Sequence, residues 1–68
     1  MDIKEKFGIR LRTLRKEKGL SQEELALKSG LNRPYISAIE KGKRNVSLEV
    51  MEKLAEAMGV QIGELVDF

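Results

Sequence analysis

The apolar residues of this 68-residue chain recur at intervals of three and four positions, which places their side chains on one face of an α-helix. The first such stripe runs through Ile3, Phe7, Leu11 and Leu14. Ile9 lies off this stripe, so we expect it to be partly exposed. No segment alternates apolar and polar residues as a half-buried strand does. The pattern therefore predicts an all-α fold without a sheet.

Capping residues and glycines divide the chain into short helices. Gly19 ends the first one. Ser21 and Glu24 then form a Ser-x-x-Glu capping box, which predicts a second helix over residues 22–29. Gly30 breaks this helix, and Asn32 is a suitable N-cap for a third helix over residues 32–41.

Two further helices are expected in the C-terminal third of the chain. Ser47 is the N-cap of a fourth helix that ends at Gly59, and a last short helix covers residues 62–66. Because 68 residues bury only about 60% of the unfolded surface, we expect one compact five-helix bundle spanning residues 1–68. We expect the helices after the first to turn the following residues inward: Leu25, Ala26, Ile36, Ile39, Leu48, Met51, Leu54, Ala55 and Met58.

The composition excludes several classes of protein. The chain has no cysteine and no histidine, so disulfides, thiolate chemistry and ordinary zinc sites are absent, and we expect neither metal nor cofactor. No paired carboxylates are framed by a pocket, so we do not expect an enzyme. The sequence begins without a signal-peptide pattern and has no apolar run long enough to span a bilayer. We therefore expect a cytoplasmic protein without a membrane partner.

The charges are unevenly distributed along the chain, although the net charge is only +2. Residues 1–18 carry seven Lys or Arg against three Asp or Glu, and residues 19–45 carry five against three. Residues 46–68 carry one against five. This asymmetry favours a basic face turned toward a polyanion and an acidic end turned away from it, although two solvated faces would also fit.

The segment over residues 22–41 has the spacing of a helix-turn-helix. Counting from Gln22 as position one, the small Ala26 falls at position five and Gly30 at position nine. The aliphatic Ile36 and Ile39 fall at positions fifteen and eighteen. A small residue lets the two helices cross, and the glycine takes a positive φ in the turn. A generic helical hairpin does not require all four features.

The run LSQEELALKSGLNRPYISAIEKGKRNVSLEVMEKLAEAMGV resembles the lambda-repressor-like, Cro/C1-type helix-turn-helix family. Within that family it looks most like the small controller proteins of restriction–modification systems. The likeness extends back through Phe7, Gly8 and Leu11 to Arg15 and forward to Leu65, so it covers nearly the whole chain. It implies a five-helix DNA-binding domain whose third helix enters the major groove.

The residues at the start of the third helix are the candidates for reading bases. Arg33 is the favoured reader, because its planar fork can donate to guanine O6 and N7 together. A solvated first-turn arginine is the alternative. Repressors of this family that read bases with amides often carry glutamines where Arg33, Pro34 and Ala38 stand here, so specificity would rest largely on Arg33 and on DNA shape. The predicted base-contacting residues are Asn32, Arg33, Tyr35 and Ser37, and a packed surface aromatic is the alternative for Tyr35.

Other polar residues are assigned to the DNA backbone or to the scaffold. Gln22 resembles the family's phosphate-clamping glutamine, and a helix N-terminus favours an anion. A second phosphate-contacting cluster is predicted at Lys41, Lys43, Arg44 and Asn45, whereas Arg12 and Lys28 are weaker candidates. By the same resemblance, Arg15 and Glu40 form a partly buried structural ion pair.

The C-terminal end carries more apolar residues than a five-residue helix needs. We expect some of them to form a two-fold dimer surface, although all could instead close the monomer core. These candidates are Val60, Ile62, Leu65, Val66 and Phe68.

The sequence thus predicts a transcriptional regulator that binds a palindromic double-stranded DNA operator as a homodimer. Restriction–modification controller, antitoxin-like autorepressor and phage-type repressor all remain open, as do activation, repression and contact with RNA polymerase. A protein-interaction adaptor that keeps the fold without binding specific DNA is the alternative from another class.

Overall fold

The computed structural model describes all residues, 1–68, and consists of five α-helices without a strand. The predicted all-α class is therefore confirmed. The helices are α1 (Ile3–Glu17), α2 (Gln22–Ser29), α3 (Arg33–Glu40), α4 (Leu48–Met58) and α5 (Ile62–Leu65). No helix of the chain is both long enough and apolar enough to cross a membrane.

The helices begin where side chains can satisfy the free backbone N–H groups of the first turn. Ser21, Asn32 and Ser47 each accept a hydrogen bond from the backbone three residues ahead, as their capping role requires. A further capping box, which the sequence analysis did not identify, starts α1. There the Asp2 carboxylate accepts from the Glu5 N–H at 2.9 Å, and the Glu5 carboxylate accepts from the Asp2 N–H at 3.0 Å.

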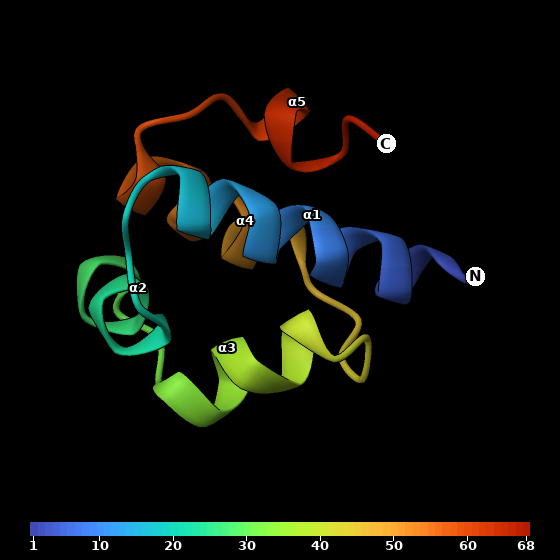
Figure 1. Cartoon of the computed structure of the whole chain (residues 1–68), viewed down its shortest axis with the longest axis horizontal. Helices are drawn as coiled ribbons and strands as arrows, with labels where there is room; N and C mark the ends of the chain where they lie inside the picture. Colours follow the sequence, from blue (N-terminus) through green and yellow to red (C-terminus); the bar gives the residue numbers. More distant parts are fainter.

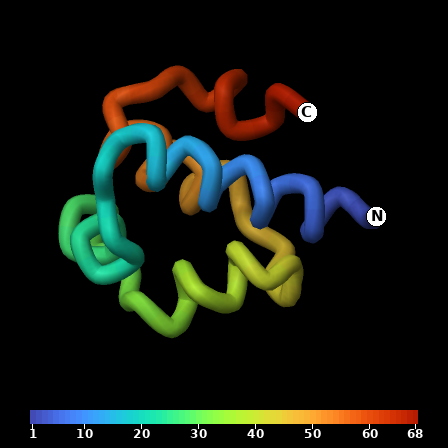
Figure 2. Tube along the Cα trace, in the orientation of Figure 1, coloured from blue at the N-terminus to red at the C-terminus, as the bar shows by residue number.

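α1 runs through the middle of the molecule and separates α3 from α5 (Figure 1). α1 contacts both of these helices, and α2 packs against α3 and α4. The N- and C-terminal ends lie on the same side of the bundle (Figure 2). This arrangement leaves α3 as an outer helix with one side free.

The core is small and fully apolar at its centre. Six side chains are completely inaccessible to solvent: Leu11, Leu25, Ile36, Ile39, Leu54 and Leu65. Ile9 is 51% exposed, as predicted, but Ile3 and Leu48 are 64% and 76% exposed although they were expected to face inward. Each of these two is the first residue of its helix and lies outside the layer of buried side chains.

Gly8 lets α1 approach the end of α3 very closely. A Cβ atom added to Gly8 would collide with the carbonyl oxygen of Ile39 and would lie 2.8 Å from that of Glu40. Both obstacles are backbone atoms, which cannot rotate away as the end of a side chain can. The small residue at this position therefore sets the distance between α1 and α3.

We predict that Gly8→Ala lowers the free energy of unfolding by about 1 to 3 kcal/mol, because the added methyl group forces the two helices apart. Urea denaturation monitored by circular dichroism measures the change. Gly63→Ala in α5 is the matched control, since nothing lies within 4 Å of its added Cβ. That control should be neutral or gain up to about 1 kcal/mol of helix propensity. Equal stability of Gly8→Ala and wild type would contradict the packing argument.

Candidate nucleic-acid interface

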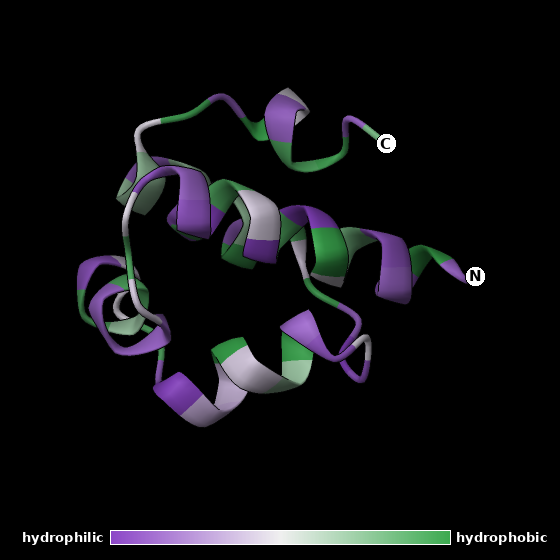
Figure 3. Cartoon of the chain, in the orientation of Figure 1, coloured by the Kyte–Doolittle hydropathy of each residue, from purple (hydrophilic) through white to green (hydrophobic).

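α3 has one apolar side and one polar side. Ile36 and Ile39 are fully buried against the other helices, whereas the side turned away from α1 is polar (Figure 3). The first turn contains Arg33 and Pro34, and Pro34 needs no intrahelical hydrogen-bond partner there. The free side of α3 is thus an exposed polar surface on a helix held by its isoleucines.

The four predicted base-contacting residues all lie on or next to this free side. Asn32 and Arg33 are exposed, and Tyr35 and Ser37 are partly buried. The side-chain oxygen of Asn32 accepts from the Tyr35 N–H at 2.8 Å, so it is occupied by capping. The two N–H groups of the Asn32 amide make no hydrogen bond within the chain, so they are free to donate.

Arg33 is tied to α2 through Gln22. The guanidinium donates from Nη1 to Gln22 Oε1 at 3.3 Å, and Gln22 donates from Nε2 to Glu40 Oε1 at 3.1 Å. The amide of Gln22 is therefore oriented by the scaffold, with its oxygen toward Arg33. Sequence reasoning selected both residues but did not identify this contact between them.

The series of hydrogen bonds from Arg33 through Gln22 ends at the ion pair between Arg15 and Glu40. Arg15 Nε lies 2.7 Å from Glu40 Oε2, and Arg15 Nη2 lies 3.0 Å from Glu40 Oε1. The two side chains are only 9% and 4% exposed. The hydrogen bond to Glu40 raises the pKa of Arg15 above its ordinary value, against the lowering effect of burial. Arg15 also donates to the Leu20 carbonyl at 2.7 Å, which fixes the turn after α1.

The N-terminus of α2 is already partly occupied by its own capping box. The Ser21 N–H donates to the Glu24 carboxylate at 2.8 Å, and this bond lowers the pKa of Glu24 below its usual 4.5. Glu24 is therefore anionic at neutral pH. An anion approaching this helix end would have to use the Gln22 side chain and the remaining first-turn amides.

A cationic loop follows α3. Lys41, Lys43, Arg44 and Asn45 are all exposed, as a phosphate-contacting cluster requires. Arg44 Cζ lies 4.7 Å from the centroid of the Tyr35 ring, a cation–π contact that the sequence analysis did not identify. This contact links the loop to the exposed side of α3.

Together, the predicted DNA-contacting residues carry several positive charges and no unpaired carboxylate. Glu40 is the one acidic residue among the predicted contacts and scaffold residues, and it is paired with Arg15. The remaining charges of the set, on Arg33, Lys41, Lys43 and Arg44, are positive. The arrangement can therefore bind a polyanion along α3 and the loop after it.

The five C-terminal dimer candidates are divided by their burial. Leu65 is fully buried in the monomer core and is not available to a partner, and Val60 is partly buried against that core. Ile62, Val66 and Phe68 are 39%, 44% and 53% exposed. The C-terminal apolar surface is therefore limited to Ile62, Val66 and Phe68.

The chain matches the helix-turn-helix family over residues 11–65. It is 52% identical over 65 residues to control protein C.MunI of a Mycoplasma species, covering 94% of this chain and 88% of that protein. Over 63 residues it is 51% identical to control protein C.BamHI of Bacillus amyloliquefaciens, covering 91% and 78%. The crystal structure of the restriction–modification controller protein C.AhdI from Aeromonas hydrophila aligns with a TM-score of 0.90 at 55% identity, covering 91% of this chain and 90% of that one. The resemblance inferred from the sequence is confirmed.

We predict that Glu40→Gln lowers the free energy of unfolding by about 3 to 5 kcal/mol, because the Arg15 charge is then buried without a counter-ion. Chemical denaturation measures the loss. Glu56→Gln, an exposed carboxylate on α4 with no ion-pair partner, is the control and should change stability by less than about 0.5 kcal/mol.

A double variant tests the same ion pair in a second way. Replacing both partners, Arg15→Met with Glu40→Leu, should recover part of the loss, because no charge then remains buried. A Glu40→Gln variant as stable as wild type would show that the pair contributes nothing to the fold.

Proposed function

The chain belongs to the helix-turn-helix family, and we propose that it is a sequence-specific DNA-binding regulator of transcription that places α3 in the major groove. The observation that carries this proposal is the position of Arg33. It lies exposed in the first turn of an outer helix, and its guanidinium donates a hydrogen bond to the Gln22 side chain. Groove-reading helices of this motif contact base edges with their N-terminal residues.

Arg33 has the donors that base reading needs. Its guanidinium carries five N–H groups, of which Gln22 takes one, so a two-pronged contact with guanine O6 and N7 remains available. Pro34 and Ala38 offer no polar contact, and Ser37 and Asn32 offer one or two donors each. Sequence specificity thus depends mainly on one guanine for each bound copy of the chain and on the shape of the DNA.

Phosphate contacts on both sides of α3 would hold the helix in register. On one side is Gln22, whose Nε2 uses one of its two N–H donors for Glu40 and keeps the other for a phosphate. On the other side are Lys41, Lys43 and Asn45. Arg44 rests over Tyr35, from where it can reach a backbone phosphate or a narrow minor groove.

Among regulators, we assign the chain to the restriction–modification controllers rather than to antitoxin-like autorepressors. The support is similarity over most of the chain to proteins named as control proteins and to a solved restriction–modification controller. A DNA partner supports a cytoplasmic location for the protein. An adaptor that had lost DNA binding would not need to keep Arg33, Lys43 and Arg44 unpaired with carboxylates on one surface.

We also propose that two copies bind a palindromic operator. One α3 covers a single half-site, and a two-fold dimer presents two such helices about one helical turn apart. The C-terminal apolar surface supplies side chains for a self-complementary contact. Ile62 is its most useful probe, because Val66 and Phe68 also border a cavity whereas Ile62 does not.

We predict different effects for the replacement of Arg33 and for the replacement of Lys43. Both are measured by fluorescence anisotropy on a selected operator and on a nonspecific duplex. Arg33→Ala should cost about 1 to 3 kcal/mol at one base pair with little loss of nonspecific affinity, because it removes a base contact. Lys43→Ala should weaken all duplexes alike and flatten the salt slope by about one unit, because it removes a phosphate contact.

Uniform loss in Arg33→Ala would show that Arg33 binds phosphate, and an unchanged salt slope in Lys43→Ala would remove Lys43 from the interface. If the wild-type chain binds no duplex even at low salt, the adaptor function is the correct one.

We predict that Ile62→Gln weakens self-association about fivefold or more, since a buried apolar contact of this size contributes roughly 1 to 3 kcal/mol. Sedimentation at micromolar concentration, with and without operator, measures it. Leu27→Gln on α2 is the control, because Leu27 is 80% exposed and outside the C-terminal apolar surface. A wild-type chain that stays monomeric in both conditions would overturn the dimer.

A further inference from the structure

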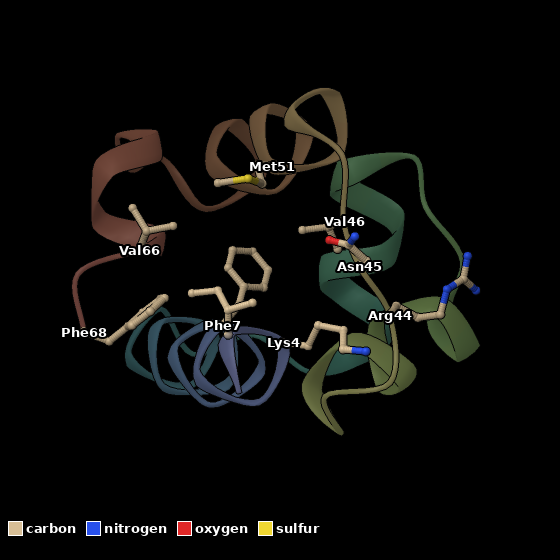
Figure 4. A pocket seen from close by; sticks show the side chains of 9 residues that line it. Lys4, Phe7, Arg44, Asn45, Val46, Met51, Val66 and Phe68 are labelled. Carbon is tan, nitrogen blue, oxygen red and sulfur yellow. The ribbon is translucent and has the colours of Figure 1, made fainter. Parts of the chain in front are cut away.

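A cavity of about 130 Å³ opens beside the cationic loop. Its walls come from the start of α1, residues 44–46, α4 and the C-terminal segment (Figure 4). These segments are distant in the sequence, so the cavity exists only in the folded chain. Neither the ion pair nor the polar side of α3 contributes to it.

The cavity has an apolar side and a polar side. Phe7, Met51, Val66 and Phe68 gather on one side, and the polar lining residues lie on the other (Figure 4). The polar residues are two cations and an amide, Lys4, Arg44 and Asn45, and no carboxylate lines the cavity. An occupant with an apolar body and an anionic group would match both sides.

Lys4 is the cation available to such an occupant. The Arg44 guanidinium points away from the cavity and lies over Tyr35, so that only its stem forms part of the wall (Figure 4). Lys4 forms no ion pair within the chain. Lys4 and Asn45 are therefore the residues on the polar side that can donate hydrogen bonds to an occupant.

We propose that this cavity binds a small aromatic carboxylate, with the ring against Phe7 and Met51 and the carboxylate toward Lys4 and Asn45. The size fits one ring, because an engineered apolar cavity of about 150 Å³ in another protein holds benzene. Val66 and Phe68 also belong to the C-terminal apolar surface proposed for the dimer, so a bound ligand and a second copy would compete for these two side chains.

Binding at this site would oppose DNA binding, a consequence that rests on the proposed function. Residues 44 and 45 line the cavity and also belong to the phosphate-contacting cluster. A carboxylate placed here adds negative charge within a Debye length, about 8 Å at physiological salt, of the positions that meet phosphates. We expect DNA affinity to fall about fivefold at saturation, and ligand affinity to fall equally when DNA is bound.

Titration of the ¹⁵N-labelled full chain without DNA tests the site itself. Benzoate should give saturable shifts at the amides of residues 45, 46, 51 and 66, with a Kd on the order of 1 mM for a ligand of this size. Benzyl alcohol, which keeps the ring but lacks the charge, should bind about threefold more weakly, and acetate should not saturate.

Two variants separate the ring from the charge. Lys4→Met should abolish the difference between benzoate and benzyl alcohol, whereas Lys53→Met, an exposed lysine on α4 outside the cavity, should leave it unchanged. Equal shifts with acetate, or shifts spread over the surface, would overturn the site. Shifts at residues 45 and 46 on raising the protein concentration without ligand would show that a second copy fills the cavity and would overturn the site, whereas a shift at residue 66 alone is expected from the proposed dimer.

Anisotropy with operator DNA at constant ionic strength tests the coupling separately. A fivefold higher Kd for DNA with saturating benzoate supports the coupling. An unchanged Kd for DNA, together with a successful titration, overturns the coupling but not the site. Failure to bind any duplex would instead reject the proposed function and leave the titration result intact.

Discussion

The hydrogen-bonded ion pair of the Glu40 carboxylate is the interaction on which the rest of the structure depends. The carboxylate accepts from Arg15 Nε, Arg15 Nη2 and Gln22 Nε2, so that one buried side chain joins α1, α2 and α3. A buried carboxylate is costly unless donors replace its water, and here three donors from two helices do so. The direct approach of α1 to the end of α3 at Gly8 brings Glu40 within reach of Arg15.

The same carboxylate organises the surface that we assign to DNA. Because Glu40 fixes the Nε2 side of Gln22, the Oε1 side faces outward and accepts from Arg33. A base-reading arginine that is restrained before binding loses less side-chain entropy on binding than a free one. The scaffold and the proposed reading residue, Arg33, thus belong to one series of hydrogen bonds.

Local signals in the sequence were enough to predict the helices. The capping box of Ser21 and Glu24, the glycine at position 30 and the spacing of Ile36 and Ile39 gave the helix-turn-helix and the limits of α2. The Asp-x-x-Glu box at the start of α1 could have been found by the same rule. Helical spacing assigned Ile3 and Leu48 to the core, but it cannot tell where a helix extends beyond its neighbours.

Contacts between helices were harder to predict from the sequence. The link between Gln22 and Arg33 and the stacking of Arg44 on Tyr35 depend on how three segments meet in space, which residue spacing does not contain. Leu65 is a similar case, because its complete burial depends on how α5 packs against α1 and α4. The candidate interface residues were therefore predictable by type and position, whereas their mutual contacts required the structure.

Selection from random duplexes, carried out in parallel on the wild-type chain and on Gln22→Ala, tests most directly whether this series of hydrogen bonds sets base reading. The account predicts that wild type enriches inverted half-sites with one invariant guanine each. Gln22→Ala should enrich the same spacing with a relaxed preference at that guanine, because Arg33 has lost its acceptor. An equally strict guanine in both selections, or no enriched sequence with the wild-type chain, would contradict it.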